Sequence, residues 1–379
     1  MRLFTWMRAV PTLACPNGLR RLPIFLLTAT LAFPATAATT DTRGIEFFSF
    51  DRFGDFGTGV GTNNRQRLLT SPIIAPRGDW QELIVSWNAI TPSATGLRVE
   101  VRAFMGERAT RFFTLGVWAS DATGHPRESV RGQQDDDGKV DTDTLILERP
   151  ARRFEIRLTL TGGTNWPELK YLCASTLNPH LRLEPLAPNQ SAWGTTLPVP
   201  ERSQMLYEGG EAWCSPTTIS MLLGFWSEKL QRPELDHLTP AVVKAVFDPR
   251  WDGTGNWVFN TAFAGSLPGM RACTVRLSDL AEVEAWIAHG YPVGLSLCYN
   301  RLRAKSREPS GHLVVLVGFT PKGDAIINDP GTRLNVRKVF ARAPVVDAWG
   351  YSKNAAYLVY PVGATLPPDR WGHWGGPRP

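Results

Sequence analysis

The stretch EGGEAWCSPTTISMLLGFW, residues 208 to 226, places a cysteine just before a largely apolar run. Ser215 can cap a helix, and Pro216 suits its first turn because proline lacks the amide hydrogen that would have no partner there. The pattern predicts a helix from about Ser215 to Leu230, with Cys214 at the positive end of the helix dipole. That position lowers a thiol pKa and directs the cysteine amide outward as an anion-binding donor. The stretch favours a nucleophile; the alternative is a small apolar residue that merely precedes a helix.

A histidine and an aspartate follow in segments that read as a hairpin. SGHLVVLVGF puts His312 at the head of an apolar strand, and TPKGDAIINDPG supplies a turn and a returning strand that ends at Asp329. Alone, a histidine at a strand end is usually a satisfied polar residue. The simplest register pairs Asp329 with Leu316, on the face of His312 but four residues along the strand. We therefore expect a β-bulge or a longer turn to close that gap, so that the carboxylate can hold the imidazole in the right tautomer.

These segments together resemble the papain superfamily of cysteine peptidases. The cysteine at a helix start, GHLVVLVGF and INDPG are most similar to the branch of bacteriocin-leader peptidases, family C-39, and WIAHGYPVGLSL matches its helix and central strand. The likeness covers about residues 200–362. It implies that Cys214 is the nucleophile, His312 the general base and acid, and Asp329 the residue that orients the imidazole. Leader peptidases of this kind are usually fused to an ABC transporter; we expect no such domain here and therefore no bacteriocin exporter.

The sequence departs from that family at the oxyanion hole. The family usually places a glutamine about six residues before the cysteine, where this chain has Glu208, whose carboxylate would repel an oxyanion. We expect the bend allowed by Gly209 and Gly210 to bring Gln204 to the site instead. The alternative is that Gln204 is ordinary linker surface.

The remaining sequence predicts an all-β part followed by an α+β part. Alternating and β-branched runs with short turns fill residues 40–182 without a helical period, which is typical of an antiparallel sandwich, here jelly-roll-like. A proline-rich stretch then separates it from helices followed by antiparallel strands, the α+β order expected of a papain-like domain. The predicted parts are a signal peptide (1–37), a β-sandwich accessory domain (40–182), a linker (183–203), the papain-like peptidase domain (204–362) and a C-terminal tail (363–379).

The N-terminus predicts export. Arg20 and Arg21 precede an apolar stretch and the A-x-A site Ala35-Thr36-Ala37, so we expect a signal peptide and a secreted or periplasmic bacterial protein. Cleavage there removes four arginines and no acidic residue, which lowers the formal net charge from +6 to +2. The net charge of the mature chain therefore gives no argument for a nucleic acid or an anionic surface as partner.

Export also permits disulfides. With Cys214 free, at most one pair remains among Cys173, Cys273 and Cys298, and Cys273 with Cys298 is the pair we expect unless all three are buried thiols.

The sequence thus predicts a cysteine peptidase that cleaves a peptide or amide bond through a thioester acyl-enzyme. The expected substrate is a peptide, a protein or cell-wall peptide. No cofactor, metal, nucleic acid or membrane span is expected; the acidic segment 133–144 fails both anchor positions of a calcium loop. Two alternatives stay open: an acyl or amide transferase of the same fold, and a catalytically silent binding module such as an adhesin or carbohydrate binder.

Overall fold

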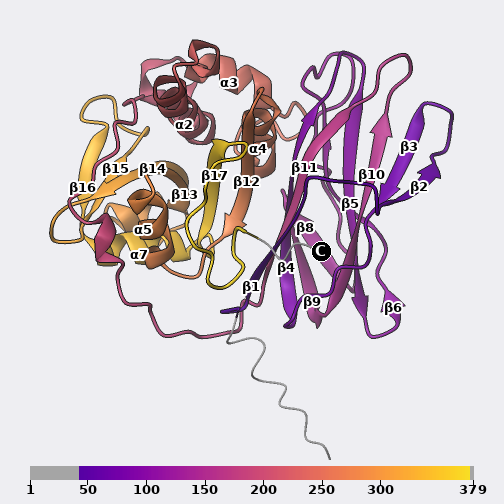
Figure 1. The fold of residues 1–379 in the computed structure, drawn as a ribbon, viewed down its shortest axis with the longest axis horizontal. Coiled ribbons are helices and arrows are strands. Elements are labelled where there is room, and N and C mark those ends of the chain that lie inside the picture. The colour runs from indigo at the N-terminus through magenta and orange to yellow at the C-terminus, as the bar shows by residue number, and fades with distance from the viewer. Residues whose placement is uncertain (1–41, 376–379) are drawn as a thin grey trace, which may run out of the picture. The chain divides into compact units, whose positions relative to one another are not determined.

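The structure is a computed structural model that describes residues 42–375 (Figure 1). The predicted signal peptide lies outside the described residues. Three sheets account for most of the regular structure, and the strands pair antiparallel. The β-rich fold expected from the sequence is confirmed. Among the described residues, no helix is long and apolar enough to cross a membrane, and no cluster of side chains has the composition of a metal site.

Residues 45–177 form two antiparallel sheets. Their orders are β1-β11-β4-β9-β8 and β2-β3-β10-β5-β6, with β7 paired to β5. The run WQELIVSWNAI forms β4 and is buried along nearly its whole length, because α4 (Trp257–Ser266) and β12 (Met270–Arg276) of the C-terminal part cover it as well. The strands are β1 (Ile45–Phe50), β2 (Gly57–Val60), β3 (Gln66–Thr70), β4 (Trp80–Ile90), β5 (Gly96–Met105), β6 (Arg108–Ala109), β7 (Phe113–Trp118), β8 (Gly138–Asp141), β9 (Thr144–Ala151), β10 (Arg153–Thr161) and β11 (Glu168–Leu177).

The C-terminal part adds helices and a third sheet, ordered β12-β17-β13-β14-β15-β16. Sequence patterns predicted α2, α3 and α5 and the strands β13, β14, β15 and β17, but α4, α6, α7, β12 and β16 were not anticipated. The helices are α2 (Cys214–Leu230), α3 (Thr239–Val246), α4 (Trp257–Ser266), α5 (Leu280–Ala288), α6 (Tyr299–Leu302) and α7 (Arg342–Gly350). The strands are β12 (Met270–Arg276), β13 (Val293–Cys298), β14 (Gly311–Phe319), β15 (Ala325–Asn328), β16 (Arg337–Phe340) and β17 (Ala355–Pro361).

The proline-rich stretch is bound to the edge of the third sheet. β13 stops pairing with β14 at Leu316, and beyond that point the amides of Gly194 and Leu197 donate to the carbonyls of Phe319 and Val317, at 2.9 and 2.8 Å. The amide of Phe319 donates in return to Thr195 at 2.9 Å. The stretch predicted as a linker therefore bonds to β14 at the residues where β13 no longer pairs with it.

Side chains join the N-terminal sheets to the C-terminal part. The Asn88 amide donates to the carbonyl of Ala272 at 2.8 Å and accepts from its amide at 3.1 Å, as a neighbouring strand would. Arg276 pairs with Glu82 at 2.9 Å, and each side chain is 3% exposed. Glu82 also pairs with Lys353, whereas loss of Glu82 would leave the buried Arg276 guanidinium without the carboxylate that pairs with it, which is costly.

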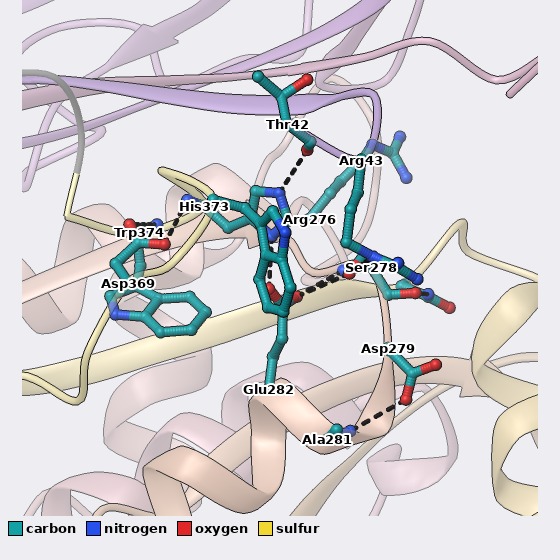
Figure 2. A network of polar contacts seen from close by, with 12 residues as sticks. Thr42, Arg43, Arg276, Ser278, Asp279, Ala281, Glu282, Asp369, His373 and Trp374 are labelled. Carbon is teal, nitrogen blue, oxygen red and sulfur yellow. Dashed lines mark hydrogen bonds and ion pairs between the residues drawn. The ribbon is translucent and has the colours of Figure 1, made fainter. Parts of the chain in front are cut away.

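The C-terminal segment, predicted as a tail, is packed as far as Trp374: His373 and Trp374 are both buried (Figure 2). The His373 ring binds Glu282 of α5 through Nδ1 at 2.6 Å and the carbonyl of Thr42 through Nε2 at 2.7 Å. Both partners are acceptors, so the ring must carry both protons to satisfy them. Burial lowers the pKa of His373, but the hydrogen bond to Glu282 and its charge raise it overall. This cation holds together the C-terminal segment, α5 and the chain just before β1.

The four described cysteines are free thiols. The expected disulfide between Cys273 and Cys298 is therefore absent, and the alternative of buried thiols describes Cys173, Cys273 and Cys298. Burial raises the pKa of Cys273 well above its usual value, and its neighbour Cys173 raises it further.

Candidate active site

Cys214 is the first residue of α2. The helix begins one residue earlier than the sequence suggested, and Ser215 does not cap it: its hydroxyl lies 2.8 Å from that of Tyr357 inside the core. The helix is otherwise almost completely buried, whereas Cys214 is half-buried at its end. The fold therefore fixes the thiol at the helix N-terminus and leaves it accessible.

His312 and Asp329 form a buried pair beside this thiol. Nε2 of His312 lies 2.8 Å from Oδ1 of Asp329, with side-chain exposures of 6% and 1%. Since Nε2 is engaged with the carboxylate, Nδ1 is left for the hydrogen bond that His312 makes with Cys214. The carboxylate thereby fixes which ring nitrogen faces the sulfur.

A bulge in the hairpin brings the aspartate to the histidine. The ladder pairs Val315 with Asn328 and Leu316 with Ile327, but Gly318 with Ile326, so that Val317 has no opposite residue. The bulge moves the end of β15 toward the start of β14 relative to the simplest register, in the direction that the sequence required. The expected bulge is confirmed.

The charges within the site favour a thiolate beside an imidazolium. Burial raises the pKa of the Cys214 thiol, but its hydrogen bond with His312, the imidazole charge and the amides of Leu313 and Ser215 lower it below the usual value. Burial lowers the pKa of His312, but hydrogen bonds with Asp329 and Cys214 and their charges raise it to about 9. Both shifts stabilise the ion pair relative to the neutral pair, and the thiolate is the nucleophilic form.

Two further residues hold the carboxylate, and sequence reasoning missed both. The Tyr299 hydroxyl donates to Oδ2 of Asp329 at 2.9 Å, and its ring centre lies 4.1 Å from that of His312. The Gly331 amide donates to Oδ1 at 2.9 Å. A Cβ atom at Gly331 would lie 2.9 Å from the Tyr299 hydroxyl and 3.0 Å from the imidazole, so a larger residue would not fit without displacing them. The sequence offered one indication of the role of Tyr299. It directly follows β13, and the end of β13 pairs with the start of β14, where His312 lies.

Gln204 lies in the loop before the nucleophile, buried to 2% exposure. Its Nε2 donates to the carbonyls of Gly210 and Glu211, at 2.9 and 2.8 Å. Both amide hydrogens are thus used within the loop, and neither is directed at a substrate oxyanion, contrary to the expected orientation. Glu208 is exposed, as expected.

Two family descriptions match the chain. Residues 56–176 match the Peptidase C39 N-terminal domain, and residues 196–357 match the Peptidase_C39 like family. The second match contains Cys214, His312, Asp329 and Gln204.

Among solved structures, the chain is similar to a C39-like peptidase from Bacillus anthracis. The identity is 14% and the TM-score 0.34, over 44% of this chain and 96% of that one. A search of curated protein sequences found no match.

Proposed function

The chain belongs to the family of C39-like, papain-like peptidases, and from this premise we propose that it is an exported cysteine peptidase that cleaves a peptide or amide bond. The single observation that carries the proposal is the contact of Cys214, at a helix N-terminus, with a histidine that a buried carboxylate orients. We further propose that the two N-terminal sheets are a jelly-roll-like accessory sandwich and that the C-terminal part is a papain-like α+β domain.

In the proposed mechanism the Cys214 thiolate attacks the carbonyl carbon of the scissile bond. The His312 imidazolium then gives its proton to the leaving amine, the carbon–nitrogen bond breaks, and a thioester remains. Neutral His312 next removes a proton from water, whose oxygen attacks the thioester and releases the acid. The cycle ends when the proton on His312 and the sulfur charge are restored. Asp329 keeps the imidazole oriented through both steps.

One alternative is acyl transfer, in which an amine replaces water at the thioester. The other is a silent binding module. The site favours catalysis over the silent module because the pKa values of Cys214 and His312 are shifted in opposite directions, which a structural thiol does not require.

The test measures alkylation of Cys214 by iodoacetamide and kcat/KM on peptide libraries and purified peptidoglycan, both against pH. We expect the thiolate to react well below the usual thiol pKa of about 8.5. Activity should rise as the thiolate forms and fall above pH about 9, where His312 loses the proton that it must donate. Cys214→Ala should abolish hydrolysis, whereas Cys298→Ala, which removes a buried thiol, should retain it.

Full activity in Cys214→Ala would contradict the proposal. An ordinary alkylation profile together with no hydrolysis would favour the silent module, and product formation that requires an added amine would favour the transferase.

A further inference from the structure

Positive charge is concentrated in two segments of the C-terminal part. Residues 299–310 and 331–342, here called the two basic segments, contain eight lysines or arginines and one acidic residue, Glu308. The whole chain has a formal net charge of only +6. The small net charge of the whole chain therefore does not reveal that positive charge is concentrated in these two segments.

The first residue of each basic segment contacts the carboxylate of Asp329. The first starts with Tyr299 and the second with Gly331, and each donates a hydrogen bond to Asp329. The guanidinium of Arg303 lies 5.1 Å from the centre of the Tyr299 ring, which itself packs on His312. Arg303 is therefore separated from the imidazole of His312 by no more than the Tyr299 ring.

The second segment reaches the loop that precedes the nucleophile. Nη1 of Arg333 donates to the carbonyl of Met205 at 2.9 Å, and the amide of the adjacent Gln204 donates to Pro330 at 3.0 Å. The positive charge thus extends along the His312 side of the site as far as the Gln204 loop.

Some of these cations already have partners. Arg337 lies 3.8 Å from Glu201, and Lys338 lies 3.9 Å from Asp329. Arg342 pairs with Glu284, and Arg301 and Arg307 share Asp347. In contrast, Arg303, Lys305 and Arg333 are exposed, and none of them has a carboxylate partner among residues 42–375. Of these, Arg303 and Arg333 lie next to residues of the site and are therefore available to a ligand there.

We propose that the two basic segments select substrates that carry carboxylates on the leaving-group side of the scissile bond. This inference rests on the proposed function. His312 must protonate the leaving amine, so the substrate residues that follow the scissile bond pass the His312 side of the site, where these cations lie. Guanidinium groups bind carboxylates through paired hydrogen bonds, and exposed charges around a cleft also steer the encounter. The substrate class is an acidic peptide.

The first experiment compares matched peptides that differ only in Glu or Gln at the two positions after the scissile bond. We expect the full-length protein to favour the acidic peptide, and Arg303→Gln and Arg333→Gln each to reduce that preference about twofold to fivefold. The preference should collapse between about 0.01 M and about 1 M salt, as the Debye length falls from about 30 Å to about 3 Å. Arg303→Lys should retain most of it. Arg149→Gln, which removes an exposed arginine from β9, should change nothing.

The second experiment needs no hydrolysis. The ratio of Cys214 alkylation by anionic iodoacetate to that by neutral iodoacetamide reports the potential at the sulfur. Arg303→Gln and Arg333→Gln should each lower this ratio about twofold, and Arg149→Gln should not.

Equal hydrolysis of both peptides, with an unchanged alkylation ratio in the variants, would overturn the inference and leave the proposed function standing. If Arg303→Gln lowered the hydrolysis of the Glu and the Gln peptide equally, Arg303 would have a structural role and would not select the substrate. Inhibition by an added polyanion, without a preference among peptides, would assign the segments to a different anionic partner. If the parent protein hydrolysed neither peptide while its alkylation ratio was normal, the result would count against the proposed peptidase function as well as the substrate class.

Discussion

At the scale of single residues, the candidate site depends on which atom each hydrogen bond occupies. Asp329 is held at both carboxylate oxygens, by His312 and Gly331 at Oδ1 and by Tyr299 at Oδ2. Burial raises the pKa of this carboxyl, but the hydrogen bond and charge of His312 lower it below its usual value. Asp329 therefore stays ionised and can keep the imidazolium protonated near neutral pH.

Gln204 uses its side-chain amide within the loop that precedes the nucleophile. Its nitrogen orders the 210–211 loop, yet an oxyanion donor would have to release one of those carbonyls. We expect Gln204→Ala to lower kcat about a hundred- to a thousandfold if it supplies a donor in the transition state. Glu208→Ala, the matched control in the same loop, should change little because Glu208 is exposed.

Alkylation of Cys214 separates the two possible roles of Gln204, because alkylation forms no oxyanion. A fall in kcat with an unchanged alkylation rate would identify an oxyanion donor. A parallel fall in both would show that Gln204 acts by ordering the loop, and an unaltered kcat would remove it from the site.

At the scale of elements, the proline-rich segment depends on a glycine in β14. A Cβ atom at Gly318 would lie 2.1 Å from the carbonyl oxygen of Thr195, so no side chain fits while that segment remains in place. We expect Gly318→Ala to displace the segment and to lower the free energy of unfolding by about 1–3 kcal/mol, the usual cost of overpacking. Chemical denaturation measures the change.

Gly350 is the matched control for this substitution. It ends α7, and a Cβ atom there would have no neighbour within 4 Å. Gly350→Ala should leave stability unchanged or slightly raised, because alanine restricts the unfolded chain. Equal effects of the two substitutions would mean that the segment does not depend on close packing over β14.

At the scale of the whole molecule, the described residues 42–375 all belong to one compact unit. The sequence suggested two domains joined by a linker at residues 183–203. The segment between β11 and Gln190 has no regular structure and contains the exposed Arg182. However, Asn88 binds Ala272, Arg276 binds Glu82 and His373 binds Thr42 across the boundaries between the predicted parts.

We therefore expect limited trypsin cleavage at Arg182 to nick the protein without releasing two independent pieces. Denaturing gels should show two fragments, whereas size-exclusion chromatography should show one species of unchanged size. The reason is that separation would expose a buried ion pair and the satisfied backbone groups of Ala272. Two folded fragments that elute separately would restore the simpler picture of independent domains.

The sequence by itself determined the features that depend on neighbours along the chain. Serine, proline and apolar spacing indicated the helix at Cys214, the turn between β14 and β15 indicated the hairpin, and their order gave the resemblance to C39-like peptidases. The need for a bulge or a longer turn also followed from the strand spacing alone, since the simplest register left Asp329 four residues from His312 along the strand.

The tertiary structure alone decided what depends on contacts between distant segments. Tyr299 meets Asp329, Asn88 meets Ala272, and His373 meets Thr42 across 331 residues, and no local pattern encodes such pairs. The two basic segments were readable as composition, but only the fold places both of them beside one carboxylate. Local propensity fixes the elements, whereas burial and charge pairing among the assembled elements fix which residues share a site.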